Sequence, residues 1–265
     1  MLSQFNSLQL IVIYITFIFQ INAQSSDSLF QKPYELNWQI DIPISTSAIA
    51  LGISFLILDS QTPPLEESYI QSMNIKSINA FDRNTIYNWS PNLSIASDIL
   101  LYTSCAIPLT LFSNNRIRKD WVKFGIMYAE TFALTATLTA LTKNLVKRPR
   151  PFVYNKNIDL NYKQEQRAQY SFFSGHTSMS AAMCFMTAKI FHDYNKSSKA
   201  KPWVWAAAII LPAVTGILRQ QSGQHFLTDI VAGYLIGGTI GILIPTLHSK
   251  KKFKKKKGKM SKTLF

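Results

Sequence analysis

Six apolar runs of near-membrane length follow a shorter apolar block along this chain. The block covers 8–21, and the runs cover 42–58, 96–113, 122–142, 177–191, 203–218 and 228–247. Few charges interrupt the runs and long β-type alternation is absent, so the pattern predicts helices. A bilayer span needs about 20 apolar residues, with ~17 as the lower limit. The sequence therefore predicts an all-α, polytopic transmembrane bundle with a core of about six helices, of which five or six span fully.

The first block is typical of a secretory signal peptide. It is followed by Asn22-Ala23-Gln24 and a serine-rich stretch, which predicts a signal peptide over 1–23 with cleavage near Ala23. No Lys or Arg precedes the block, so an uncleaved anchor is the alternative. We expect the rest to divide into 24–95, with a short apolar helix at 42–58 and a polar connection, a helical-bundle domain at 96–249, and a lysine-rich tail at 250–265.

The net charge of +14 is concentrated at the C-terminus, where nine lysines lie between Lys250 and Lys262. Without them the balance falls to +5, which is ordinary for a bacterial-type inner-membrane protein with basic cytoplasmic loops. The tail is therefore expected to be cytoplasmic and to contact anionic lipid headgroups, and no nucleic-acid partner is expected. Hydrophobic residues make up 47% of the chain and charged residues 16%, which also favours a membrane protein.

A cytoplasmic tail predicts the side of each loop. Counting back from the tail, the basic loops 114–121 and 192–202 fall on the cytoplasmic side, and the loops 143–176 and 219–227 fall outside.

The number of crossings has two solutions. A cleaved signal puts the mature N-terminus outside, whereas the tail is expected inside. The chain must then cross the membrane an odd number of times, although six runs are present. Either 42–58 is re-entrant or interfacial, leaving five crossings, or 8–21 is retained and crosses too.

Three polar clusters at the external ends of the runs carry the candidate chemistry. In the first, Lys143 and Arg150 are seven residues apart, about two helical turns, and Pro149 and Pro151 end the helix. An arginine can clamp a phosphate through two parallel donors, and a lysine adds a point charge. The alternative is a positive flank that only fixes topology.

The second cluster, Ser174-Gly175-His176, precedes an apolar run. Serine suits a helix N-cap, glycine permits close backbone approach, and free amides at a helix start bind anions. His176 is placed to reach a phosphate bound there. The alternative is a capped helix with an incidental histidine.

The third cluster is Arg219, His225 and Asp229. The last two are four residues apart at the predicted start of the final helix, hence on one face. A carboxylate bonded to one ring nitrogen fixes the tautomer and frees the other as a nucleophile. The alternative is a surface His–Asp pair. His192 and His248 have no such partners in the sequence, and no role is assigned to them.

Together the clusters resemble the type 2 phosphatidic acid phosphatase family, whose superfamily includes vanadium haloperoxidases. That family has the motifs K-x(6)-R-P, P-S-G-H and S-R-x(5)-H-x(3)-D. The corresponding residues here are Lys143 with Arg150-Pro151, then Phe173-Ser174-Gly175-His176, then Leu218-Arg219 with His225 and Asp229. All six charged or histidine positions match in order, while Phe173 replaces a proline and Leu218 a serine.

The resemblance implies a metal-free, cofactor-free phosphatase that acts through a phosphohistidine. Lys143, Arg150 and Arg219 would bind the phosphoryl oxygens, with backbone donors at Ser174 and Gly175. His225, oriented by Asp229, would attack phosphorus, and His176 would protonate the leaving oxygen.

The implied substrate is a membrane-lipid phosphate or diphosphate at the external face. Candidates are undecaprenyl diphosphate, phosphatidylglycerophosphate, phosphatidic acid and the lipid A phosphates. Two alternatives remain: another reaction on the same site, such as lipid phosphotransfer or halide oxidation, and a non-catalytic protein that binds anionic lipid through its lysine tail.

Overall fold

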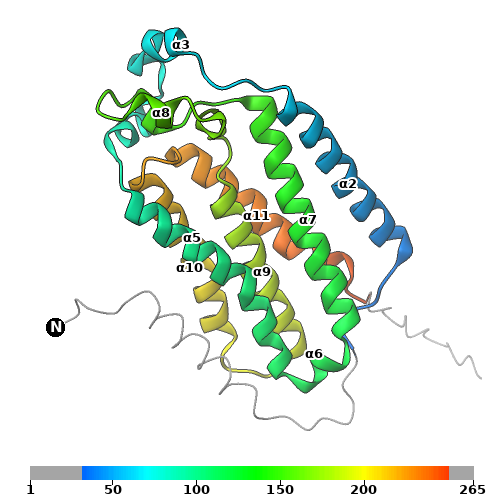
Figure 1. The fold of residues 1–265 in the computed structure, drawn as a ribbon. Coiled ribbons are helices and arrows are strands. Elements are labelled where there is room, and N and C mark those ends of the chain that lie inside the picture. The colour runs from blue at the N-terminus through cyan, green and yellow to red at the C-terminus, as the bar shows by residue number, and fades with distance from the viewer. Residues whose placement is uncertain (1–31, 251–265) are drawn as a thin grey trace, which may run out of the picture.

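Each of the six apolar runs forms a long helix, and the six helices lie side by side in a bundle (Figure 1). The computed structural model describes residues 32–250, so the expected signal peptide and the tail beyond Lys250 lie outside the described residues. The long helices are α2 (Trp38–Ser60), α5 (Pro91–Ala106, continued by the 3₁₀ segment η3, Ile107–Ser113), α7 (Trp121–Val146), α9 (Gly175–Tyr194), α10 (Lys201–Gln221) and α11 (Leu227–Leu247). The predicted all-α fold is confirmed.

By length and composition, five segments between residues 32 and 250 can cross a membrane. They are Trp38–Ser60, Pro91–Ser113, Trp121–Tyr154, Lys201–Gln221 and Leu227–Leu247. The sixth long helix, α9, is more polar and is shielded from the surroundings, because α5, α7, α10 and α11 all pack against it. The chain is a multi-pass membrane protein.

The expectation of a short helix at 42–58 needs correction. α2 has 23 residues and packs along α7, and polar residues at both ends extend it beyond its apolar run. The described ends of the chain also meet, since Tyr34 forms an antiparallel bridge with Ser249 and the amide of Glu35 donates to the carbonyl of His248 at 2.9 Å. Six long helices between two described ends that meet favour the alternative in which 42–58 crosses as well. The block 8–21, which that alternative retains as a further crossing, lies outside the described residues.

The loops alternate between the two ends of the bundle as predicted. The end that contains Tyr34 and Ser249 also contains the short helix α6 (Asn115–Lys119) and the turn after α9, where Asn114 donates to Asn195 at 3.0 Å. The opposite end is covered by a cap of short elements (Figure 1). These are α3 (Glu67–Ser72), η1 (Ile75–Ser77), α4 (Ala80–Arg83), η2 (Asn84–Tyr87), η4 (Pro151–Tyr154), α8 (Leu160–Lys163) and η5 (Gln166–Gln169).

A stripe of glycines lets α11 approach the backbone of α9. A Cβ atom added at Gly233, Gly237 or Gly241 would lie 2.6, 1.9 or 2.3 Å from a carbonyl oxygen of α9. Small residues four apart permit such close helix packing in membrane proteins. This contact fixes the start of α9 beside the start of α11, which brings the second and third motifs together.

Candidate phosphate site

The first cluster lies where α7 ends, as predicted. The helix stops at Val146 because Lys147 adopts a left-handed conformation (φ +47°), and the chain continues extended through Arg150. Lys143 Nζ donates to the carbonyl of Tyr170 at 3.0 Å, and Arg150 donates to the side chain of Gln224. Both cations therefore lie beneath the cap rather than on one continuous helix face.

The second cluster forms the start of α9. Ser174 is the N-cap, as predicted, and its Oγ accepts a hydrogen bond from the amide of Thr177 at 3.4 Å. The amide of Ser174 donates to the carbonyl of Asp229 at 3.0 Å, which leaves the amides of Gly175 and His176 for an anion. A Cβ at Gly175 would lie 3.9 Å from Lys143 Nζ, so the first cation stands next to this helix start.

The geometry of His225 and Asp229 differs from the prediction. α11 begins at Leu227, so His225 precedes the helix, and Asp229 Oδ2 accepts from the Phe226 amide at 2.9 Å as part of the helix cap. His225 Nδ1 donates to the carbonyl of Ser171 at 2.8 Å and is 3.8 Å from Asp229 Oδ2. The backbone carbonyl, and not the carboxylate, makes the hydrogen bond that fixes the tautomer.

Asp229 acts within a buried network that the sequence analysis did not identify. Its carboxylate accepts from Ser171 Oγ at 2.5 Å and from Arg148 Nη1 at 2.5 Å. Arg148 also pairs with Asp82 at 2.8 Å, and Asp82 accepts from the amide and hydroxyl of Thr228. Asp229 thus holds Ser171 in place, and Ser171 in turn holds His225.

Asp98 of α5 is a second residue that the sequence analysis missed. Its Oδ1 is 2.6 Å from His176 Nε2 and 3.3 Å from Arg219 Nη1, so it joins the second and third clusters. Arg219 also donates to the hydroxyls of Ser94 and Ser97 at 3.1 and 3.2 Å. The family motif has a serine just before this arginine, where this chain has Leu218. Ser94 and Ser97 place two other hydroxyls beside Arg219.

The signals for these residues differ. Asp98 is the sole charge in the run 96–113, and an ionisable residue inside an apolar run is a functional candidate by default. In the sequence, Arg148 lies between Lys143 and Arg150. Nothing in this basic segment showed that Arg148 contacts other residues than they do. Asp82 had no signal, because the cap that places it has no apolar pattern.

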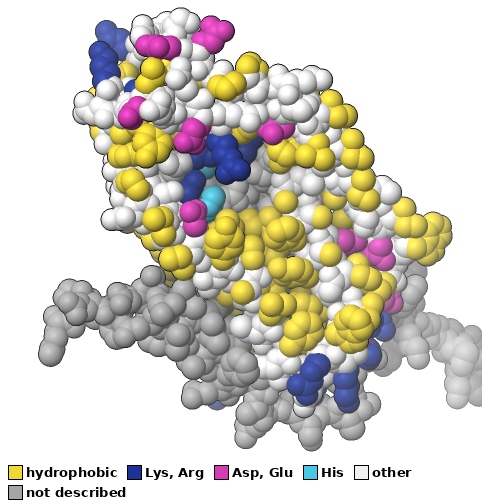
Figure 2. Space-filling model, in the orientation of Figure 1, with side chains coloured by type: hydrophobic (Ala, Val, Ile, Leu, Met, Phe, Trp, Pro, Cys, Tyr) yellow, Lys and Arg dark blue, Asp and Glu magenta, His cyan; other side chains and the backbone are white. Residues whose placement is uncertain are grey.

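The site is a hollow lined with positive charge. Figure 2 shows Lys and Arg side chains gathered in a depression near the capped end, with a histidine and acidic side chains beside them and hydrophobic side chains over the flank of the bundle. The His225 side chain is 1% exposed, and its Nε2 has no hydrogen-bond partner among residues 32–250. Burial, and then the charges of Lys143, Arg150 and Arg219, lower the pKa of His225 well below its usual value. The ring is therefore neutral near pH 7, with a free lone pair on Nε2.

His176 occupies the more open part of the hollow. Its side chain is 24% exposed and that of Asp98 is 43% exposed, whereas Asp229 is fully buried. A molecule that enters from solvent therefore meets His176 before it reaches His225. The arrangement places a shielded histidine, His225, behind an accessible one, His176.

Two comparisons of the sequence with known proteins point to the same family. Residues 124–253 match the family model of the PAP2 superfamily. The chain is 26% identical over 137 residues to an undecaprenyl-diphosphatase of Sulfolobus acidocaldarius, and 28% identical over 142 residues to phosphatidylglycerophosphatase B of Bacillus subtilis. These matches cover 50% and 52% of this chain but only 59% and 64% of the two relatives.

A solved structure is also similar. It is the crystal structure of a transmembrane PAP2-type phosphatidylglycerolphosphate phosphatase from Bacillus subtilis, with 21% identity and a TM-score of 0.48, covering 76% of this chain and 94% of the other. The matched range 124–253 contains all six charged or histidine motif positions, and the fold brings them to one hollow. The chain belongs to the PAP2 superfamily.

Proposed function

We propose that this protein is an integral-membrane lipid phosphatase that hydrolyses a phosphomonoester or diphosphate of a membrane lipid through a phosphohistidine. The observation that carries the proposal is the state of His225. Its Nδ1 donates to the Ser171 carbonyl, and its Nε2 is buried, neutral and without a hydrogen-bond partner among the described residues, beside three cations. A dianionic phosphate is the ligand that these cations and this lone pair jointly suit.

Lys143, Arg150 and Arg219 would hold the phosphoryl oxygens, with the amides at the start of α9 as further donors. Phosphoryl transfer depends mainly on positioning and on charge stabilisation, which these groups supply. We propose that the reaction needs no metal ion at the phosphate, because the three side chains provide the positive charge there.

In the first step, His225 Nε2 forms a bond to phosphorus while the bond from phosphorus to the lipid oxygen breaks. His176, whose Nε2 is held by Asp98, gives a proton to the leaving oxygen. In the second step, His176 takes a proton from water, the water oxygen bonds to phosphorus, and the bond to His225 breaks. Inorganic phosphate and the dephosphorylated lipid are the products.

We also propose an orientation in a bacterial inner membrane. The basic loops at 114–121 and 192–202 share one end of the bundle with Ser249, and an excess of Lys and Arg is typical of cytoplasmic loops. The phosphate site at the opposite end would then face the periplasm or the outside. Its substrate would be a lipid whose headgroup is exposed in the outer leaflet.

The test is phosphate release by detergent-purified protein from phosphatidic acid, phosphatidylglycerophosphate, undecaprenyl diphosphate and lipid A. Because the names of the two curated relatives refer to a diphosphate and to a phosphatidylglycerophosphate lipid, we expect release from one of those two. Release should persist in EDTA at 25 °C. Transfer of phosphate to a second lipid would show that the reaction is phosphotransfer and not hydrolysis. Release of phosphate from none of the four lipids would contradict the proposal.

Replacement of Asp98 by asparagine is expected to lower kcat about ten- to a hundredfold. Burial and the charges of Arg219, Lys143 and Arg150 lower the pKa of His176 to about 2, so His176 can serve as an acid only when a bound phosphate offsets those charges. Asparagine keeps the shape of Asp98 but removes the charge that then stabilises protonated His176, and general acids contribute about 10²–10⁴ to such reactions. The fall in kcat with rising pH should therefore begin at lower pH than in the wild type. Steady-state kinetics between pH 5 and 9 measures this.

Asp159→Asn is the matched control, because Asp159 is an exposed residue of the cap, outside the hydrogen-bond network of Asp98, and its carboxylate accepts from the Asn161 amide. Its kcat and its pH profile should match those of the wild type. A lower kcat in Asp98→Asn with an unchanged pH profile would show that Asp98 supports the fold and does not act through His176.

A further inference from the structure

A second cluster of titratable side chains lies at the end of the bundle opposite the phosphate site. His248, at the end of α11, is 1% exposed, and its Nε2 is 2.6 Å from Asp41 Oδ1 and 3.4 Å from Glu130 Oε2. Asp41 belongs to the first turn of α2 and Glu130 to α7. One ligand atom from each of the three residues lies within 4.8 Å of the others. No role was assigned to His248 from the sequence, because its partners are more than a hundred residues away.

The protons of this cluster can be assigned from its geometry. His248 Nδ1 is 2.8 Å from the carbonyl oxygen of Ile244, which can only accept, so Nδ1 carries a proton and donates it. In a neutral ring, Nε2 is then a lone pair that faces two carboxylates. Three acceptors pointing at one another repel, so the cluster needs either a proton on Nε2, which Asp41 would accept at 2.6 Å, or a metal ion between the three groups.

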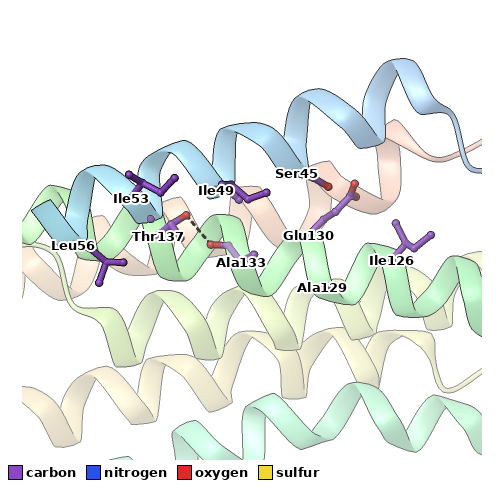
Figure 3. Close-up of a pocket in the computed structure, with 11 residues that line it drawn as sticks. Ser45, Ile49, Ile53, Leu56, Ile126, Ala129, Glu130, Ala133 and Thr137 are labelled. Atoms are coloured by element: carbon purple, nitrogen blue, oxygen red, sulfur yellow. Dashed lines mark hydrogen bonds between the residues drawn. The ribbon is translucent and has the colours of Figure 1, made fainter.

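The carboxylate of Glu130 also lacks a hydrogen-bond donor among the described residues. The residue is 4% exposed, and neither carboxylate oxygen accepts a hydrogen bond from any residue between 32 and 250. A buried carboxylate without a donor is costly unless a positive charge compensates it. Figure 3 shows Glu130 facing α2 across from Ser45, beside a cavity of about 550 Å³ between α2 and α7.

We propose that His248, Asp41 and Glu130 bind one divalent transition-metal ion. An imidazole with two carboxylates is a donor set that suits zinc or manganese, whereas calcium and magnesium prefer oxygen ligands alone. Ligand atoms about 2.1 Å from one ion in a tetrahedral site lie about 3.4 Å apart. The distance from His248 Nε2 to Glu130 Oε2 equals that spacing, whereas Asp41 Oδ1, at 2.6 Å, would have to move outward when an ion binds. A ring nitrogen that donates to a carbonyl is also the usual arrangement on the far side of a metal-binding histidine.

The ion would tie together three parts of the chain that are distant in sequence. It would join the start of α2 to α7 and to the end of α11, where the Glu35 amide already donates to the His248 carbonyl. α2 contacts the bundle mainly through α7, so it has most to gain from such a link. The site is thus a structural one, separate from the proposed phosphatase centre.

The test uses the full chain, purified in detergent without a histidine tag and stripped with EDTA. Zinc should bind at one ion per chain by titration calorimetry and elemental analysis, manganese more weakly, and magnesium not measurably. At a hundredfold excess over Kd, zinc should raise Tm by about 5–10 °C. Absence of one-to-one binding by the wild type would overturn the proposal and would leave a proton as the cation.

Glu130→Gln and Asp41→Asn keep side-chain size and remove one charge each, so zinc affinity should fall about a hundredfold or more. His192→Ala and His225→Ala are the controls, one on the same half of the bundle and one in the phosphate site; both should bind zinc like the wild type. Asp41 is partly exposed and tolerant of exchange, so its variant decides the matter if Glu130→Gln does not fold. Unchanged zinc affinity in Asp41→Asn, or loss of zinc affinity in His225→Ala, would contradict the proposal that His248, Asp41 and Glu130 bind the ion.

Discussion

Replacing His225 with alanine is expected to reduce phosphate release by about a thousandfold or more, because it removes the atom that bonds to phosphorus. The three cations and the start of α9 remain, so the lipid should still bind. Rapid quenching with a ³²P-labelled lipid should trap a phosphoenzyme in the wild type and none in the variant. Binding of unreactive substrate analogues should change little.

His192→Ala is the matched control for this experiment. His192 lies on the half of the bundle away from the phosphate site, where its Nδ1 accepts from Trp205 Nε1 at 3.2 Å. Its loss should leave turnover and trapping intact. Wild-type turnover in His225→Ala would refute the nucleophile assignment while leaving membership of the superfamily untouched.

Replacing Gly237 with alanine is expected to destabilise the bundle by about 3 kcal/mol or more. The added Cβ would lie 1.9 Å from the carbonyl oxygen of Ser178 and 2.8 Å from its Cα. These are backbone atoms of α9, which cannot rotate away, so the two helices must separate. In a chain of this size the loss corresponds to a decrease in Tm of about 6–12 °C, measurable by thermal unfolding in detergent.

The neighbouring glycine provides the control. A Cβ at Gly238 would lie 3.5 Å from the ring of Phe185, which is ordinary van der Waals contact. Gly238→Ala should therefore be neutral or slightly stabilising, since alanine favours helix over glycine. Equal effects of the two substitutions would show that the close approach of α9 and α11 is not what the glycine stripe provides.

Gly237→Ala should also impair turnover, because the same interface positions the site. The amide of Ser174 donates to the carbonyl of Asp229 across it, so separated helices would displace the start of α9 from His225. We therefore expect the positions of the second and third motifs to depend on the packing of α9 against α11 at Gly237. A stable variant with full turnover would contradict that dependence.

Some features could be read directly from the chain because they follow from local spacing. The apolar runs specify six helices, since a helix in lipid must satisfy its own backbone hydrogen bonds. Pro149 and Pro151 predict the end of α7, and Ser174 predicts the cap of α9. The resemblance of the three motifs to those of the phosphatase family implies that Lys143, Arg150, His176, Arg219, His225 and Asp229 belong to one site.

Other features depend on contacts between distant segments, and no local pattern contains them. Asp98 lies 78 residues before His176, and Arg148 lies 81 residues before Asp229. The sequence placed the Asp229 carboxylate on the ring of His225, but the helix began two residues later and Ser171 supplied the bond. The carboxylate partners of His248 were hidden for the same reason.

The sequence by itself determined the helices, the multi-pass character and the residues that carry the proposed chemistry, because periodicity, helix ends and motif spacing are local. Only the tertiary structure decided which groups hold those residues in place. It showed α2 as a full-length helix beside α7, Asp98 between His176 and Arg219, and His248 between two carboxylates. Such pairings arise from the packing of whole helices against one another, and packing is a property of the folded chain.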